Sequence, residues 1–232
     1  MDQSLKPLDV AYGSALSGQR QRVLRNTYAL LALSMVPTVL GAWAGVAFNF
    51  CFFAGSPFIG FLVFMAVAFG FFYAIEKNKN SGIGVVLLLA FTFFMGLMLS
   101  RLIGRVLGFS NGAQLIALAF GGTGLVFVTM ATLATTIKRD ISGMGKWLTV
   151  GAIVLLLAIV ANIFLQLPAL MLTISALAVA LFSAFILYDL KQVIDGGETN
   201  YVTATLAVYL DVYNVFTSLL QLLMALGGAS DD

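Results

Sequence analysis

The chain has 232 residues, of which 61% are hydrophobic and 9% are charged, and its formal net charge is +2. Its mean hydropathy is +1.03. Uncharged runs of this length exceed what a soluble core of this size needs, so the composition excludes a soluble globular protein. The small net charge gives no support for a nucleic-acid partner. The sequence therefore predicts a protein whose surroundings are the lipid bilayer.

Seven segments are long and apolar enough to cross a membrane, because a spanning helix needs about 20 mostly apolar residues. They lie at 27–50, 57–75, 82–100, 113–137, 147–167, 169–188 and 201–226. Strands of a membrane β-barrel alternate apolar and polar residues over about 10 positions, and these segments do not. We predict an all-α membrane protein with a seven-helix transmembrane domain at 25–228, preceded by a flexible cytoplasmic tail at 1–24.

The division between the fifth and sixth helices depends on a short polar segment, because residues 147–188 carry no charge. Asn162, Gln166 and Pro168 supply the polar and helix-breaking character of a hairpin apex. Glycine runs such as GGTG at 121–124 favour close helix approach in lipid, where small residues let backbones meet.

Basic residues predict the orientation of the chain, because loops rich in Lys and Arg stay in the cytoplasm. Ten of them fall on one side of a seven-helix arrangement: Lys6, Arg20, Arg22, Arg25, Lys77, Lys79, Lys138, Arg139, Lys146 and Lys191. Only Arg101 and Arg105 fall on the other side, where contact with lipid phosphate is the simplest interpretation. The amino terminus is expected in the cytoplasm, and the carboxyl terminus with Asp231 and Asp232 outside.

The residue types present exclude most familiar enzyme chemistry. The chain has no histidine, and Cys51 is its only cysteine. A His or Cys zinc cluster and a Ser-His or Cys-His nucleophile therefore cannot be assembled, and no glycine-rich loop carries a phosphate-binding Lys. We expect neither an enzyme of the soluble type nor a cofactor.

Asp211 is the leading candidate for function, because it lies near the middle of the last apolar segment. A carboxylate near the bilayer centre costs roughly 2.5 to 3.5 kcal/mol and normally faces a protein interior or a water-filled path. Four further polar residues share its helix face within about 80° at 100° per residue: Thr203, Asn214, Ser218 and Gln221. The stripe suggests that helix seven is central, with Asp211, Asn214 and Ser218 along an ion pathway. Interhelical hydrogen bonding without transport is the alternative.

Asp189 is the second acidic candidate and lies at the end of the sixth segment, where simple hydration at the interface is an alternative role. In a plain hairpin turning at Gly196 and Gly197, Asp189 would be offset from Asp211 by about 9 Å along the axis. Tilt or stagger of the last helix would close that gap. The two carboxyl groups would then share a proton, titrate as a coupled pair and form a transient calcium site.

Three segments of the carboxyl-terminal half carry a family resemblance: VANIFLQLPALMLTISA at 160–176, YDLKQVIDGGETNYVTAT at 188–205 and YLDVYNVFTSLLQLL at 209–223. They resemble the Bax inhibitor-1 family, and VLRNTY at 23–28 is similar to its bacterial branch, which modulates a membrane-anchored AAA quality-control protease. The resemblance implies six helices around a central seventh. It also implies an aspartate pair, matched by Asp189 and Asp211, that senses pH and governs a calcium leak.

One departure from the family concerns a basic latch that channels of this family carry on helix two. Residues 57–75 contain no Arg or Lys. The main hypothesis is nevertheless a pH-sensitive calcium leak in a bacterial inner membrane. A regulator of the membrane-anchored AAA protease is the alternative, and an intramembrane aspartyl protease is a remote one, because Val208, Tyr209 and Leu210 replace the GxG expected before the second aspartate.

Overall fold

A computed structural model describes residues 6–50 and 56–227, with side chains from residue 18 onward, so Cys51, Asp231 and Asp232 lie outside the described residues. The described chain forms seven α-helices. Their bounds are α1 Lys6–Ala47, α2 Pro57–Asn78, α3 Gly82–Val106, α4 Gly112–Thr136, α5 Met144–Leu165, α6 Pro168–Asp195 and α7 Tyr201–Gly227. All seven contain a stretch long and apolar enough to cross a membrane, which confirms the predicted number of spans.

The hairpin between α5 and α6 forms at the predicted residues. Gln166 caps the end of α5 in the left-handed region at φ 51°, and its N–H donates to the carbonyl oxygen of Asn162 at 2.9 Å. The Asn162 side chain then accepts a hydrogen bond from the N–H of Leu167 at 3.0 Å. Pro168 follows as the first residue of α6, where its missing N–H costs nothing. The polar apex therefore satisfies backbone groups that the two helix ends would otherwise leave unpaired.

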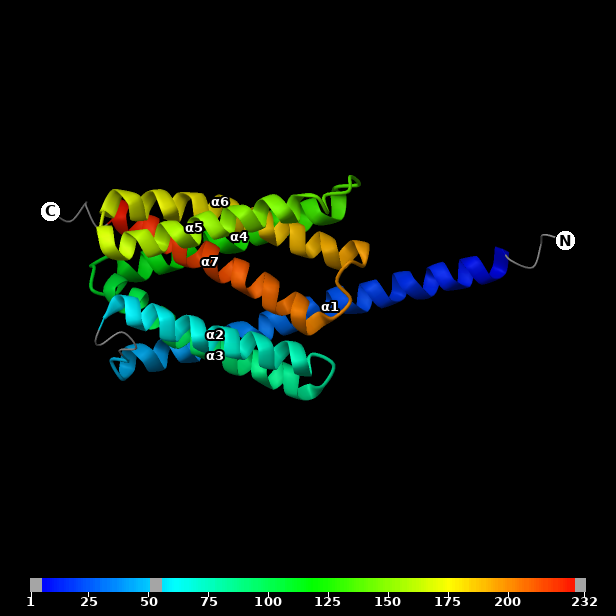
Figure 1. The fold of residues 1–232 in the computed structure, drawn as a ribbon, viewed down its shortest axis with the longest axis horizontal. Helices are drawn as coiled ribbons and strands as arrows, with labels where there is room; N and C mark the ends of the chain where they lie inside the picture. Colours follow the sequence, from blue (N-terminus) through cyan, green and yellow to red (C-terminus); the bar gives the residue numbers. More distant parts are fainter. Residues whose placement is uncertain (1–5, 51–55, 228–232) are drawn as a thin grey trace.

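The helices form two groups with α7 running obliquely between them (Figure 1). In this view α1, α2 and α3 form the lower group, and α4, α5 and α6 form the upper group. α7 packs against α1, α2, α3, α4 and α6. Its oblique path is the main feature that hydropathy cannot predict, because hydropathy gives the length of a span and not its tilt.

Close packing of α1 against α3 depends on glycines at matching positions. A Cβ at Gly96 would overlap the carbonyl oxygen of Thr38, and a Cβ at Gly41 would overlap that of Phe93. One turn further along, a Cβ at Gly45 would overlap the side chain of Ser100. Gly41 and Gly45 stand four residues apart, the small-xxx-small spacing that lets membrane helices approach through their backbones.

The GGTG segment does not take the role that the sequence suggested. A Cβ at Gly121 or Gly124 would meet nothing within 4 Å, and at Gly122 it would make only an ordinary contact with Leu219 at 3.4 Å. Close helix approach is therefore provided by the glycines of α1 and α3. The physical reason is that glycine content alone does not show which face of a helix meets a neighbour.

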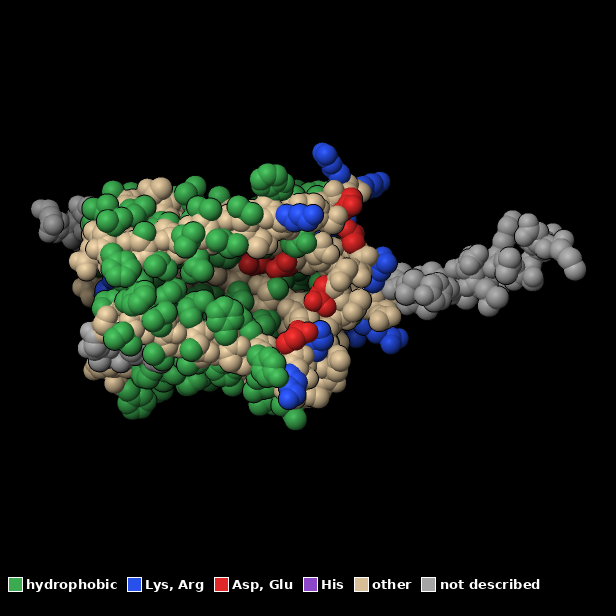
Figure 2. Space-filling model, viewed as in Figure 1, with side chains coloured by type: hydrophobic (Ala, Val, Ile, Leu, Met, Phe, Trp, Pro, Cys, Tyr) green, Lys and Arg blue, Asp and Glu red, His purple; other side chains and the backbone are tan. Residues whose placement is uncertain are grey.

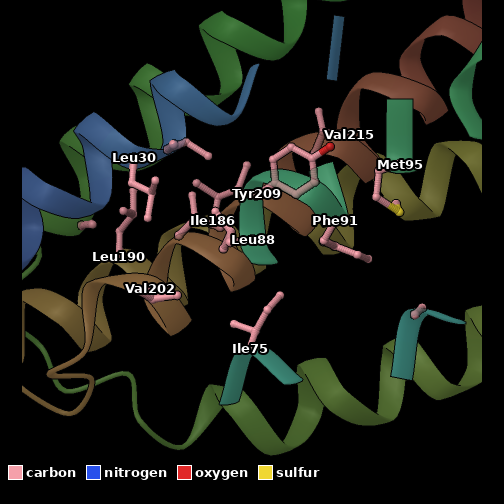
Figure 3. Packing of buried hydrophobic residues seen from close by; sticks show 14 residues of the cluster. Leu30, Ile75, Leu88, Phe91, Met95, Ile186, Leu190, Val202, Tyr209 and Val215 are labelled. Atoms are coloured by element: carbon pink, nitrogen blue, oxygen red, sulfur yellow. The ribbon is translucent and has the colours of Figure 1, made fainter. Parts of the chain in front are cut away.

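The largest buried cluster joins the two groups of helices around α7 (Figure 3). Tyr209 lies among its labelled residues, and its ring meets that of Phe91 edge to face at 6.4 Å. Ile186 of α6 and Leu88 of α3 are also fully buried in this cluster. The core thus fixes the middle of α7 against helices of both groups.

Charged side chains gather at one end of the bundle, at the right of Figure 2. This end carries the α2–α3, α4–α5 and α6–α7 connections, and α1 extends beyond it toward the amino terminus (Figure 1). We call it the basic end. α1 is helical from Lys6, so much of the segment at 1–24 that the sequence assigns to a flexible tail is helix.

Candidate functional site

The oblique path of α7 brings the two candidate aspartates together. The carboxyl group of Asp189 on α6 lies within hydrogen-bonding reach of that of Asp211 on α7. The axial offset of a plain hairpin is therefore closed by the tilt of the last helix, which Figure 1 shows. We call these two residues the carboxyl pair.

The two members of the carboxyl pair differ in exposure. Asp211 is 5% exposed, and its Oδ2 atom is buried without a hydrogen bond from any described N–H or O–H donor. Asp189 is half-buried. Acidic side-chain atoms are visible in the hollow between the two helix groups in Figure 2. Because a carboxylate only accepts hydrogen bonds, a bond between these two groups requires one of them to carry a proton.

Some polar residues of the stripe next to Asp211 form hydrogen bonds within α7, and others form them with a neighbouring helix. Asn214 donates its amide to the carbonyl oxygen of Leu210 in the same helix at 2.8 Å, and Ser218 is buried. Gln221 accepts a hydrogen bond from Ser175 of α6 at 3.0 Å, the interhelical role that the sequence left open. Asn214 and Ser218 lie on the same helix face as Asp211, on the side of the pair away from the basic end.

Thr203, which the sequence places on the same stripe, belongs to the start of α7. Its hydroxyl donates to the carbonyl oxygen of Asn200 at 3.1 Å. The Asn200 side chain accepts from the N–H of Val202 at 2.9 Å, which caps the helix, and donates to the carbonyl oxygen of Lys79 at 3.1 Å. Asn200 therefore ties the α6–α7 turn to the α2–α3 turn, a role that the sequence analysis missed.

Two tyrosines hold the opposite face of α7 and were also missed. The hydroxyl groups of Tyr209 and Thr38 lie 2.8 Å apart, and the Tyr213 hydroxyl donates to the carbonyl oxygen of Met95 at 3.2 Å. They are four residues apart, hence on one helix face, about 160° from Asp211. The four-residue spacing of Tyr209 and Tyr213 is the sequence feature that could have indicated this second polar face of α7. α7 is thus bonded to α1 and α3 on one side and carries Asp211 on the other.

The α6–α7 turn is fixed at the basic end. Gly196 has φ 85° and its N–H donates to the carbonyl oxygen of Gln192 at 3.1 Å. The N–H of Gly197 donates to the same oxygen at 2.8 Å, so the turn closes as a Schellman motif, for which glycine is the favoured residue. Lys191 is 7% exposed and donates to Asp195 at 2.8 Å. These contacts fix the short connection that sets the register of the carboxyl pair.

Metal-binding capacity at the pair is limited to two carboxyl groups. Within residues 6–50 and 56–227, no group of three or more His, Cys, Asp or Glu side chains could hold a metal ion. Calcium takes about six to eight oxygen ligands, so a calcium ion here would need water and carbonyl oxygens besides Asp189 and Asp211. The two carboxyl groups alone are therefore fewer ligands than a calcium ion takes.

A bundle of seven apolar helices, with a carboxyl pair between α6 and α7, defines a polytopic membrane protein with ionisable groups inside its bundle. Residues 20–228 match the family described as Inhibitor of apoptosis-promoting Bax1. The chain belongs to this family, the Bax inhibitor-1 family, as its sequence motifs indicate.

Three bacterial relatives are similar over nearly their whole length. An uncharacterized protein of Neisseria meningitidis is 41% identical over 95% of this chain and 98% of its own. The modulator of FtsH protease YccA of Escherichia coli K12 is 38% identical over 91% of this chain and 92% of its own. An uncharacterized protein of Pseudomonas aeruginosa is 38% identical over 93% of this chain and 95% of its own.

Proposed function

We propose that this protein is a pH-sensitive cation leak, conducting calcium or protons, in which Asp189 and Asp211 form the gate. The observation that carries the proposal is the proximity of the two carboxyl groups, one of which, that of Asp211, is buried and has an Oδ2 atom that no described donor satisfies. Buried carboxyl groups in membrane helices mark ion or proton pathways more often than structural contacts.

The physical basis of gating is the proton that the two carboxyl groups must share to stay in contact. When that proton leaves, two like charges face each other at short range in a poorly hydrated site, so they separate or take up a cation. Asn214 and Ser218 would extend the polar path from the pair away from the basic end. The proposal keeps α7 as the central helix, supported by its contacts with five others.

The proposed setting is a bacterial inner membrane, with the amino terminus in the cytoplasm and the carboxyl terminus in the periplasm. The concentration of Lys and Arg at one end supports this orientation. A relative from Escherichia coli O6:H1, named Inner membrane protein YccA, supports the location. We keep 25–228 as the transmembrane domain and 1–24 as the cytoplasmic segment.

The test of the leak is calcium flux through the purified protein in liposomes across a range of pH. The Asp211→Asn variant should lose the pH dependence, because an amide cannot exchange the proton on which gating depends. Asp140→Asn, an exposed acid of the α4–α5 loop, is the matched control and should behave as the wild type. Unchanged pH-dependent flux in the Asp211→Asn variant would refute the proposal.

A second function is favoured by one comparison. The Escherichia coli K12 relative is named as a modulator of FtsH protease, and its likeness covers 91% of this chain. We propose that this chain also regulates a membrane-anchored AAA protease through the part of α1 that extends beyond the basic end. The two functions are separable, because the carboxyl pair and this extension lie in different parts of the molecule. No catalytic activity is proposed.

The test of regulation is a deletion that spares the bundle. Arg20 lies against Gly196 at the α6–α7 turn, so removal of residues 1–17 should leave that contact intact. The truncated chain should remain folded while proteolysis of a membrane substrate by the AAA protease rises. Unchanged proteolysis, together with failure of the full chain to co-purify with the protease from native membranes, would contradict this role.

A further inference from the structure

A cavity of about 780 Å³ lies at the end of the bundle opposite the basic end, between the last turns of α1 and α3. Arg101, Gly104 and Arg105 of α3 line one side, and Val46, Asn49 and Phe50 line the other. Its size falls within the range of about 300–1,000 Å³ that small-molecule sites occupy. The cavity is separate from the carboxyl pair, none of whose residues line it.

The α1 wall of this cavity is a fixed structure. Asn49 adopts the left-handed conformation at φ 49°, and its N–H donates to the carbonyl oxygen of Val46 at 3.3 Å. The N–H of Phe50 donates to the carbonyl oxygen of Gly45 at 2.8 Å. These bonds form a Schellman motif, with asparagine in the position that glycine usually takes. The motif turns the chain at the end of α1 and places Phe50 at the cavity.

The α3 wall combines positive charge with open space. Arg101 and Arg105 stand one turn apart on the same helix face, and both are exposed. A Cβ at Gly104, between them, would meet nothing within 4 Å. Among the described residues that line the cavity, these two arginines are the charged ones.

The remaining lining is mostly apolar and includes Val46, Phe50, Met98 and Leu102. A ligand that suits both parts has an anionic phosphate next to an apolar body. The cavity lies where α3 ends at Val106, hence at the level of the lipid headgroups if α3 spans the bilayer. A small hydrated anion would leave most of this volume and its apolar wall without contacts.

We propose that this cavity is a binding site for the headgroup and upper chain of one anionic phospholipid. Arg101 and Arg105 bind its phosphate, the absence of a side chain at Gly104 leaves room for its glycerol region, and Phe50, Met98 and Leu102 contact its first methylenes. Arginine suits this role because its planar guanidinium donates two parallel hydrogen bonds to phosphate oxygens.

The experiment is native mass spectrometry of the full chain, purified in detergent and supplied with phosphatidylglycerol or phosphatidylcholine. The wild type should retain one phosphatidylglycerol in preference to the zwitterionic lipid. Arg105→Gln should lower retention about fivefold, the loss expected for one basic contact near a membrane surface. Gly104→Phe, which fills the cavity and keeps both charges, should lower retention by at least as much. Arg139→Gln, an exposed basic residue at the basic end, is the charge-matched control and should retain the lipid.

Each other outcome overturns the proposal. Equal retention of both lipids excludes recognition of an anionic headgroup. Unchanged retention in the Gly104→Phe variant, together with a loss in Arg105→Gln, shows surface attraction without a cavity site. Displacement of the lipid by excess inorganic phosphate identifies a phosphate site rather than a lipid site. Circular dichroism and elution volume identify a variant that does not fold, and Gly104→Leu then replaces Gly104→Phe.

Discussion

At the residue scale, the hydroxyl groups and the carboxyl groups of the core form their hydrogen bonds in different ways. Buried hydroxyls such as Thr27, Ser34 and Thr123 donate to carbonyl oxygens four residues earlier in their own helices. A carboxylate cannot make that bond, because it has no proton to donate. The hydrogen bonding of the carboxyl pair therefore depends on its protonation, unlike that of these hydroxyls.

The Asp189→Asn variant is expected to lose the pH dependence of calcium flux as Asp211→Asn does, because the proposed gate needs both carboxyl groups. The double variant should behave as either single one, since the pair acts as a unit. Flux in liposomes at several pH values measures the effect. Additive effects of the two substitutions would show that the aspartates act independently.

Tyr209→Phe should lower the free energy of unfolding by about 0.6 to 1 kcal/mol, because it removes the hydroxyl that bonds Thr38 of α1 at 2.8 Å and, more weakly, the carbonyl oxygen of Thr92 of α3 at 3.5 Å. Thr38 keeps its own bond to the carbonyl oxygen of Ser34, so no buried hydroxyl is left unpaired. Unfolding in mixed detergent measures the loss. Tyr73→Phe, at a residue 70% exposed on α2, is the control and should change little. Equal losses in the two variants would contradict the structural role of the Thr38 contact.

At the element scale, the contact between α1 and α3 is the closest helix packing that the glycines provide. Gly96→Ala should destabilise the bundle by about 1 to 3 kcal/mol, because its Cβ overlaps the backbone of Thr38 and the two helices must move apart. Gly70→Ala in α2, where a Cβ meets open space, is the matched control. Stability in detergent distinguishes the two. A loss equal in both variants would mean that the α1–α3 contact is looser than described.

The sequence predicted the elements far better than their packing. Seven spans and the apex at Asn162, Gln166 and Pro168 follow from hydropathy and helix-breaking residues, which act locally. The small-residue contact was assigned to the wrong glycines, because Gly121 and Gly41 look alike without knowledge of their neighbours. The pairing of Asp189 with Asp211 depended on a helix tilt that packing sets. Tyr209 and Asn200 were missed because their partners lie on distant helices.

At the scale of the whole molecule, the distribution of charge predicts which end faces the cytoplasm. In a Cys51→Ser background, a Gly108→Cys variant in the α3–α4 turn should react with an impermeant maleimide added to spheroplasts. An Asp140→Cys variant in the α4–α5 loop should react only after permeabilisation. Both positions are exposed in the structure, so a difference in their labelling reports the side of the membrane and not burial within the protein. The opposite labelling pattern would invert the proposed topology.

The seventh helix has a mean hydropathy of 1.4, the lowest among the seven candidate spans, and it contains Asp211. Released alone from the insertion machinery, it would carry its acid into lipid at a cost of about 2.5 to 3.5 kcal/mol. Beside α6 the same acid lies next to the carboxyl group of Asp189. α6 and α7 should therefore enter the bilayer together, so that the carboxyl pair forms as the two helices insert.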